Sequence, residues 1–91
     1  MEREVKIINK LGLHLRAATQ LINLASKFDG EITISCNGNT ADAQSVMDVL
    51  MLAATKGTMV TLAASGETEE DERQIIDEIT ELINNRFNEG E

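Results

Sequence analysis

The sequence predicts an α+β domain in the order βαββαβα, an open-faced sandwich in which three helices cover one face of a four-stranded antiparallel sheet. Three observations predict this class. Hydrophobic residues alternate with polar ones in several short segments, they recur with helical spacing in others, and "NG" at Asn37–Gly38 marks a hairpin. A chain of 91 residues has room for a single domain, 1–91, with one core.

The first two elements are a strand and a helix. Val5 and Ile7 share one face of a strand that ends near Asn9. From Arg16 to Phe28 the pattern becomes helical, and "FDG" ends that helix. Its apolar positions follow the spacing i, i+3, i+4, i+7 and are Leu21, Leu24, Ala25 and Phe28.

A β-hairpin follows the first helix. Ile32, Ile34 and Cys36 alternate with polar residues and predict a half-buried strand. Both residues of the "NG" pair accept positive φ angles in a type I′ turn. The chain is therefore expected to return as a short strand from residue 39 to about residue 43.

A short second helix is predicted from Ser45 to about Ala54. Ser45 can cap this helix, and Asp48 stands at the third helical position, where a carboxylate completes a capping box. The apolar stripe of the helix consists of Val46, Val49, Leu50 and Ala53. The "KGT" segment then breaks it.

The last two elements are a strand and a long helix. The strand is predicted around Val60, Leu62 and Ala64, and Thr68 opens the helix. The acidic run Glu67–Glu72 suits the positive end of the helix dipole. Because consecutive helical residues point in different directions, we interpret this run as a solvated first turn and not as a metal site. The buried seam of the helix is expected to contain Ile75, Ile79, Leu82 and Ile83.

Composition limits the possible functions. The formal net charge of −8 at pH 7 argues against binding to nucleic acid, because that needs clustered Lys and Arg. The single cysteine, Cys36, cannot form an internal disulfide, and we interpret it as a small buried hydrophobic residue. The first residues lack the apolar segment of a signal peptide, and no stretch is long enough to span a bilayer. We therefore expect a cytoplasmic protein without membrane insertion.

The only histidine, His14, lies in "NKLGLHLRAAT", between Gly12 and Arg16. A lone histidine is most often a buried core residue, and no ligand cluster supports a metal site. The neighbours of His14 favour a third interpretation, a nucleophile. The unpaired amides of the following helix form an anion site, and Arg16 adds a cation suited to phosphate oxygens. The same positive field disfavours imidazolium and leaves a ring nitrogen free to react.

Two segments carry a resemblance to a known family. "LGLHLRAA" resembles the active-site signature of HPr, the histidine-containing phosphocarrier of the bacterial phosphotransferase system. "NGNTADAQSVMDVLMLAATKG" resembles the second signature of that family, around its regulatory serine. The similarity covers nearly the whole chain. "NKLG" and "SVMDVLMLAATKG" look somewhat closer to the nitrogen-related branch, NPr.

The resemblance implies a phosphoryl relay in the cytoplasm. Enzyme I, charged by phosphoenolpyruvate, would phosphorylate His14 on Nδ1, and the protein would pass the group to a histidine of an enzyme IIA domain. Arg16 would contact the phosphate, and the backbone at Leu15 and Ala17 would cradle it. Such a protein is a phosphorylated carrier and not a free-standing enzyme. It needs no metal or other cofactor, and we expect a monomer.

The second signature implies regulation and docking. Ser45 would be the regulatory serine, with an HPr serine kinase/phosphorylase as a further partner, although helix capping alone also explains a serine here. The exposed docking patch of the family maps onto Val46, Met47 and Leu50. Two alternatives stay open at this stage. One is a non-catalytic regulatory module that acts through Ser45 and the docking face, and the other is a structural domain whose histidine is inert.

The sequence departs from the family pattern near the active histidine. Ala17 stands where the family has proline, and Leu15 stands where it usually has Ala or Thr. Asn23 and Ser26 occupy positions where many members have lysines that meet acidic Enzyme I. Loss of the proline restores one N–H group and removes a preset φ angle from the first helical turn.

Overall fold

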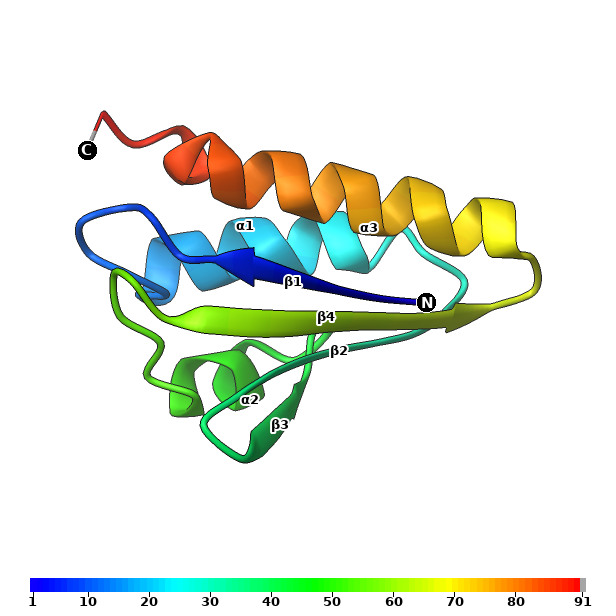
Figure 1. The fold of residues 1–91 in the computed structure, drawn as a ribbon, viewed down its shortest axis with the longest axis horizontal. Helices are drawn as coiled ribbons and strands as arrows, with labels where there is room; N and C mark the ends of the chain where they lie inside the picture. Colours follow the sequence, from blue (N-terminus) through cyan, green and yellow to red (C-terminus); the bar gives the residue numbers. More distant parts are fainter. Residues whose placement is uncertain (91) are drawn as a thin grey trace.

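The computed structural model describes residues 1–90, which form a four-stranded antiparallel sheet with helices packed on it (Figure 1). The strand order is β1-β4-β2-β3. The elements are β1 (Glu2–Lys6), α1 (Leu15–Ala25), β2 (Gly30–Cys36), β3 (Asn39–Asp42), α2 (Val46–Met51), β4 (Met59–Gly66), α3 (Glu69–Asn84) and a 3₁₀ turn, η1 (Arg86–Asn88). The predicted fold class is confirmed. Within residues 1–90, every helix is too short or too polar to span a lipid bilayer.

One core lies between the sheet and the helices. Antiparallel pairing sets Val5 of β1 opposite Val60 of β4, and Ile34 of β2 opposite Leu62 of β4. These four side chains are buried, as alternation along a half-covered strand requires. Helices α1 and α3 also contact each other. The buried positions of these two helices are Ala17, Ala18, Leu21, Ala25, Ile75, Ile76, Ile79 and Ile83.

The buried stripe of α3 differs from the predicted one at two positions. Ile76 is fully buried although the prediction left it out, and Leu82 is only partly buried. The reason is that α3 packs against β1, β4 and α1 together. A helix with neighbours on two sides buries a broader stripe than a single seam.

Helix α1 ends at Ala25, three residues before the predicted end at Phe28. Phe28 instead packs its ring over two glycines at the end of the sheet. A Cβ atom at Gly30 would lie 2.7 Å from the Phe28 ring, and one at Gly66 would lie 2.5 Å from it. The ring therefore occupies the space that side chains would fill at these two positions.

Helix α2 differs from the prediction in two details, the capping box and the position of Ala53. Ser45 does cap the helix, and its Oγ accepts from Asp48 N at 3.4 Å. The Asp48 carboxylate, however, accepts from Asp42 N at 3.4 Å, so the reciprocal half of the capping box is not formed. Ala53 lies outside the helix and is exposed, with a φ angle of 51°.

The acidic first turn of α3 is held by local hydrogen bonds. Thr68 caps the helix and accepts from Asp71 N at 3.1 Å. Glu72 accepts from Gly66 N at 3.0 Å, and chiefly this bond lowers the pKa of Glu72. Within residues 1–90, no group of three or more His, Cys, Asp or Glu side chains is placed to hold a metal ion.

The turn after α3 was not predicted. Arg86, Phe87 and Asn88 have φ angles of 55°, 52° and 63°, a left-handed conformation that costs a non-glycine residue roughly 1–2 kcal/mol. Burial of Phe87, which is 1% exposed, offsets part of the cost of these three residues. Gln20 of α1 adds two bonds, from its Nε2 to Phe87 O at 3.0 Å and from Asn88 Nδ2 to its Oε1 at 3.1 Å. The turn is therefore fixed against α1.

Candidate functional site

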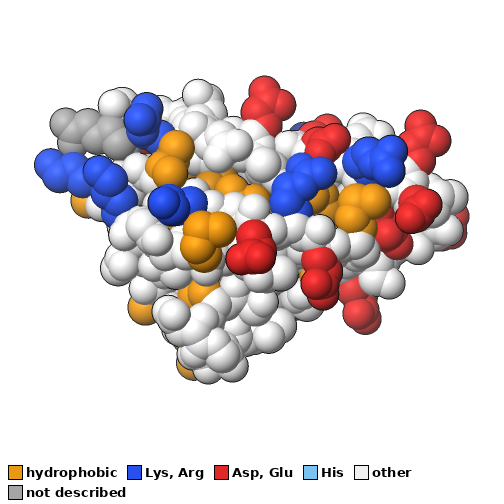
Figure 2. Space-filling model, viewed as in Figure 1, with side chains coloured by type: hydrophobic (Ala, Val, Ile, Leu, Met, Phe, Trp, Pro, Cys, Tyr) orange, Lys and Arg blue, Asp and Glu red, His pale blue; other side chains and the backbone are white. Residues whose placement is uncertain are grey.

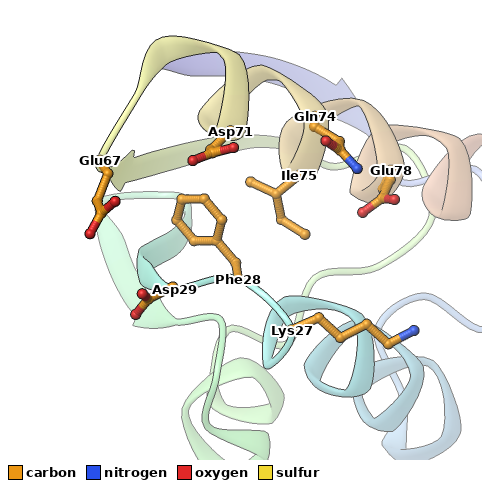
Figure 3. Close-up of a pocket in the computed structure, with 8 residues that line it drawn as sticks. All are labelled: Lys27, Phe28, Asp29, Glu67, Asp71, Gln74, Ile75 and Glu78. Carbon is orange, nitrogen blue, oxygen red and sulfur yellow. The ribbon is translucent and has the colours of Figure 1, made fainter.

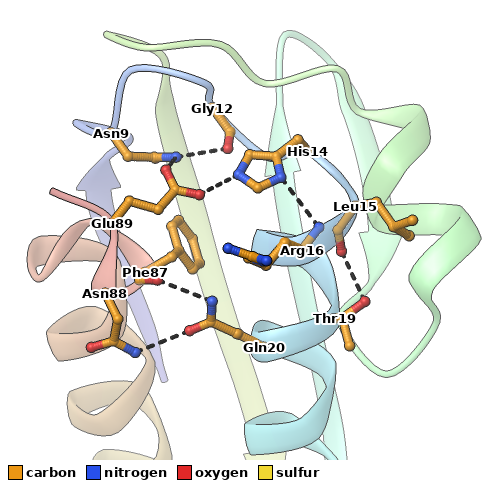
Figure 4. A network of polar contacts seen from close by, with 10 residues as sticks. All are labelled: Asn9, Gly12, His14, Leu15, Arg16, Thr19, Gln20, Phe87, Asn88 and Glu89. Atoms are coloured by element: carbon orange, nitrogen blue, oxygen red, sulfur yellow. Dashed lines mark hydrogen bonds and ion pairs between the residues drawn. The ribbon is translucent and has the colours of Figure 1, made fainter. Parts of the chain in front are cut away.

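His14 is the N-cap residue of α1. Its backbone is extended, and its Nδ1 accepts from Arg16 N at 3.2 Å (Figure 4). The side chain is 28% exposed, so His14 is not a core histidine. An Nδ1 atom that accepts a hydrogen bond carries a lone pair and no proton. The nucleophilic interpretation requires that state.

Gly12 places His14 through a close backbone approach. Its φ angle is 70°, and a Cβ atom there would lie 2.5 Å from Ala54 O and 2.9 Å from Thr55 Cα. Leu13 N also donates to Ala54 O at 2.9 Å. The segment before α1 is thereby held against the chain that follows α2. Only glycine fits this position, because a side chain would be both strained and in collision.

The first turn of α1 presents free donors beside the imidazole. The N–H groups of Leu15 and Ala17 donate to no acceptor within residues 1–90, and that of Arg16 donates to Nδ1 itself. Unpaired amides at a helix N-terminus favour an anion. The two predicted cradle positions are thus the two with free donors.

A shallow pocket of about 520 Å³ opens at this end of the molecule. Figure 2 shows basic side chains gathered at the end where α1 begins, and acidic ones crowded at the far end, around the first turn of α3. The chain is acidic as a whole, but this end of it is suited to an anionic group. The pocket is lined by Lys10, Leu11, His14, Arg16, Glu89 and Gly90.

Glu89 belongs to the site, and sequence reasoning missed it. Its Oε2 contacts His14 Nε2, and its Oε1 accepts from Asn9 Nδ2 at 3.0 Å (Figure 4). A carboxylate accepts, so the ring proton lies on Nε2 and the lone pair on Nδ1. The one available signal was Phe87, an aromatic residue isolated after the last predicted helix.

Glu89 is ionised at neutral pH. Burial raises the pKa of its carboxyl, but hydrogen bonds from Asn9 and His14, together with the positive charge of Arg16, more than offset burial and hold that pKa below its usual value. The site therefore combines a carboxylate at Nε2 of the imidazole with free amides near Nδ1, and the charge of Arg16 lies close enough to act on Glu89. The two nitrogens of the ring have separate surroundings.

The predicted docking and regulatory residues lie on α2, outside this pocket. Met47 is 68% exposed, whereas Val46 and Leu50 are half-buried. Ser45 Oγ is occupied as a helix cap. Helix α2 packs against α1, which brings these residues near the site without joining it. The predicted docking patch also left out two exposed apolar side chains next to His14, those of Leu11 and Leu15.

A second pocket, of about 390 Å³, lies at the other end of α1 (Figure 3). Phe28 and Ile75 form its apolar floor. Among the described residues that line the pocket, Lys27 is the single basic one. The described lining contains no histidine, cysteine or serine that could serve as a nucleophile. Its acidic rim consists of Asp29, Glu67, Asp71 and Glu78.

Residues 1–85 match the sequence model of the PTS-HPr family, described as the PTS HPr component phosphorylation site. This chain belongs to the HPr family. It is 47% identical over 91 residues to the phosphocarrier protein HPr of Cupriavidus necator, covering 100% of this chain and 99% of that protein. It is 46% identical over 90 residues to the phosphocarrier protein NPr of Shewanella violacea, covering 99% of this chain and 96% of that protein.

A solved HPr structure has the same fold. The crystal structure of HPr-C-His from Thermoanaerobacter tengcongensis superposes with a TM-score of 0.92 at 33% identity, covering 100% of this chain and 99% of that one. The family resemblance and the phosphocarrier function are confirmed. Assignment to the NPr branch stays a prediction, because the HPr and NPr relatives named here match almost equally well.

Proposed function

We propose that this HPr-family phosphocarrier accepts a phosphoryl group from Enzyme I on Nδ1 of His14 and passes it to a histidine of an enzyme IIA domain. One observation carries this assignment. Nδ1 accepts a hydrogen bond from Arg16 N, lies on a partly exposed ring and is directed at the amides that begin α1. The donor is charged by phosphoenolpyruvate, a cytoplasmic metabolite, so we place the reaction in the cytoplasm.

The chemistry at Nδ1 needs few further groups. The Nδ1 lone pair forms the new N–P bond, the bond from phosphorus to the donor atom breaks, and its electron pair stays with the donor. Arg16 N–H then loses Nδ1 as its acceptor and, with the N–H groups of Leu15 and Ala17, is free to donate to phosphoryl oxygens. The Arg16 guanidinium adds positive charge.

Enzyme I and phosphoenolpyruvate provide the direct test. The wild-type protein should gain the mass of one phosphate, and that phosphate should be labile in acid and stable in base, as expected for phosphohistidine. A phosphate that survives acid would point to Ser45 and to the regulatory alternative. Capping already accounts for Ser45, and we do not favour that alternative.

The proposed docking role of Met47 predicts that a charge at this position weakens binding to Enzyme I. Its exposed side chain can enter an apolar contact with a partner, so Met47→Asp should weaken binding to Enzyme I roughly 5- to 30-fold, the effect of one buried contact residue. Its melting temperature should stay within a few degrees of wild type. Calorimetric titration measures the affinity. The control is Met59→Asp on β4, which lies on the helix-free face of the sheet. Equal loss in both variants would contradict a docking role for Met47.

The missing proline predicts a gain in stability. Ala17 N–H donates to no acceptor within residues 1–90, so Ala17→Pro loses no hydrogen bond and restricts the unfolded chain. We expect about 0.4–1 kcal/mol of stabilisation. This corresponds to about 2–8 °C in melting temperature. Proline removes one of the three amides near Nδ1, but those of Leu15 and Arg16 remain and the first helical turn becomes stiffer, so transfer should be unchanged or faster.

A neighbouring alanine provides the control for that variant. Ala18 N donates to His14 O at 2.8 Å, so Ala18→Pro should destabilise the protein. Thermal unfolding and Enzyme I-dependent phosphorylation would be measured on both. If Ala17→Pro lost both stability and transfer, the Ala17 amide would be a required donor, and this active site would differ from that of relatives with proline.

A further inference from the structure

The C-terminal turn brings a carboxylate onto the reactive imidazole, on the side away from Nδ1. We propose that Glu89 is a positioning residue for phosphoryl transfer, which holds the proton on Nε2 of His14 and stabilises the charge that the ring gains. This inference rests on the proposed function of His14. The contact joins two residues that are 75 positions apart in the chain.

Four features hold Glu89 in place. Phe87 anchors the turn in the core, and Gln20 of α1 bonds both Phe87 O and Asn88. Asn85 Nδ2 donates to Asn88 Oδ1 at 2.7 Å. All three residues of η1 have positive φ angles although none is glycine. Strained backbone that its surroundings maintain is typical of functional sites.

Asn9 orients the carboxylate from the other side. It is fully buried, and its Nδ2 donates both to Gly12 O at 2.9 Å and to Glu89 Oε1 at 3.0 Å. Its Oδ1 is buried without a partner among the described residues, which is unfavourable. The Asn9 amide is therefore oriented so that its NH₂ group binds two acceptors. One is Gly12 O, in the segment before His14, and the other is the Glu89 carboxylate.

The geometry assigns Glu89 a role in the transfer step. When the Nδ1 lone pair forms the N–P bond, Nε2 keeps its proton and the imidazole ring becomes cationic. The carboxylate that already accepts from Nε2–H stabilises this charge. It also prevents rotation of the ring, so Nδ1 stays directed at the free amides of α1.

Glu89→Gln separates this role from packing. A carboxylate has two acceptor oxygens, one for His14 and one for Asn9, whereas an amide has a single oxygen and two N–H donors. The side chain of the Glu89→Gln variant therefore has an acceptor oxygen at only one of the two positions that Glu89 uses, and it carries no charge. Glu89→Ala removes both contacts. The matched control is Glu81→Gln, an exposed residue of α3 with the same change in charge.

Steady-state kinetics with Enzyme I and phosphoenolpyruvate should show the effect in kcat. We expect kcat to fall about tenfold for both Glu89 variants, the lower end of the range for groups that orient a functional histidine. KM should stay unchanged, and Glu81→Gln should behave as wild type. Nitrogen-15 spectra of the unphosphorylated protein should show a slowly exchanging His14 Nε2–H in wild type and Glu81→Gln, and lose it in Glu89→Ala.

Each other outcome overturns a defined part of this account. An unchanged kcat in both Glu89 variants overturns the proposal, whether or not the Nε2–H signal persists. A rise in KM with kcat retained makes Glu89 a docking residue and also overturns it. A wild-type protein that takes no phosphate from Enzyme I overturns the proposed function itself. Wild-type phosphorylation with wild-type kinetics in the variants overturns only the role of Glu89.

Discussion

His14→Ala is expected to abolish phosphorylation by Enzyme I and phosphoenolpyruvate, the largest effect of any single change. His14 is the only histidine in the chain, so no second imidazole can replace it. The fold should survive. The lost cap, in which Nδ1 accepts from Arg16 N, should cost roughly 0.5–1 kcal/mol. The labelled phosphate is measured by mass before and after acid treatment.

The control for this variant is His14→Asn. Asparagine is among the best N-cap residues, so its side chain can accept from the first-turn amides in place of Nδ1. We expect wild-type stability and no phosphorylation, which separates the loss of the nucleophile from the loss of the cap. Acid-labile phosphate on either variant would contradict the assignment of His14.

Arg16→Ala is expected to slow phosphoryl transfer roughly ten- to a thousandfold, with the upper value set by the loss of a strong electrostatic stabiliser. The guanidinium lines the pocket beside His14, and no other arginine within residues 1–90 does. The substitution keeps the backbone N–H at position 16, so the cap on Nδ1 remains and the melting temperature should change little. Rapid-quench measurement of the single transfer step gives the rate.

Arg16→Lys tests what the arginine contributes beyond its charge. Lysine keeps the positive charge but lacks the planar donors that bind two phosphate oxygens at once. Its rate should fall between those of wild type and Arg16→Ala. Transfer at the wild-type rate in Arg16→Ala would show that the amides of α1 suffice and that Arg16 has no role in the step.

The sequence was sufficient where neighbouring residues determine the structure. Alternation predicted the strands around Ile34 and Leu62, and the "NG" pair predicted the hairpin, whose Asn37 and Gly38 have φ angles of 52° and 82°. The start of α1 was equally local, because His14 and Arg16 are two residues apart. In each case the spacing alone determines which side chains share a face.

The sequence was insufficient where distant segments meet. Asp48 was expected to complete a capping box, but the return strand offers Asp42 N as a competing donor. The η1 turn contains no glycine, so its positive φ angles could not be predicted from the sequence. Packing of Phe87 against the core imposes these angles. Glu89 could not be placed on His14 without that turn. The surroundings of the imidazole at Nε2 therefore could not be predicted from the residues next to His14.

The strained η1 turn also has a consequence for the dynamics of the protein. Strain lowers the free energy of opening that segment relative to the sheet, and Phe87 is the one buried residue among the three of η1. Segments of this kind exchange between closed and open forms without unfolding of the whole domain, on timescales from microseconds to seconds. The amides of residues 86–89 should accordingly exchange with solvent sooner than those of β4. Each transient opening of this turn would release the imidazole from Glu89 while the rest of the molecule stays intact, and closing would restore the contact.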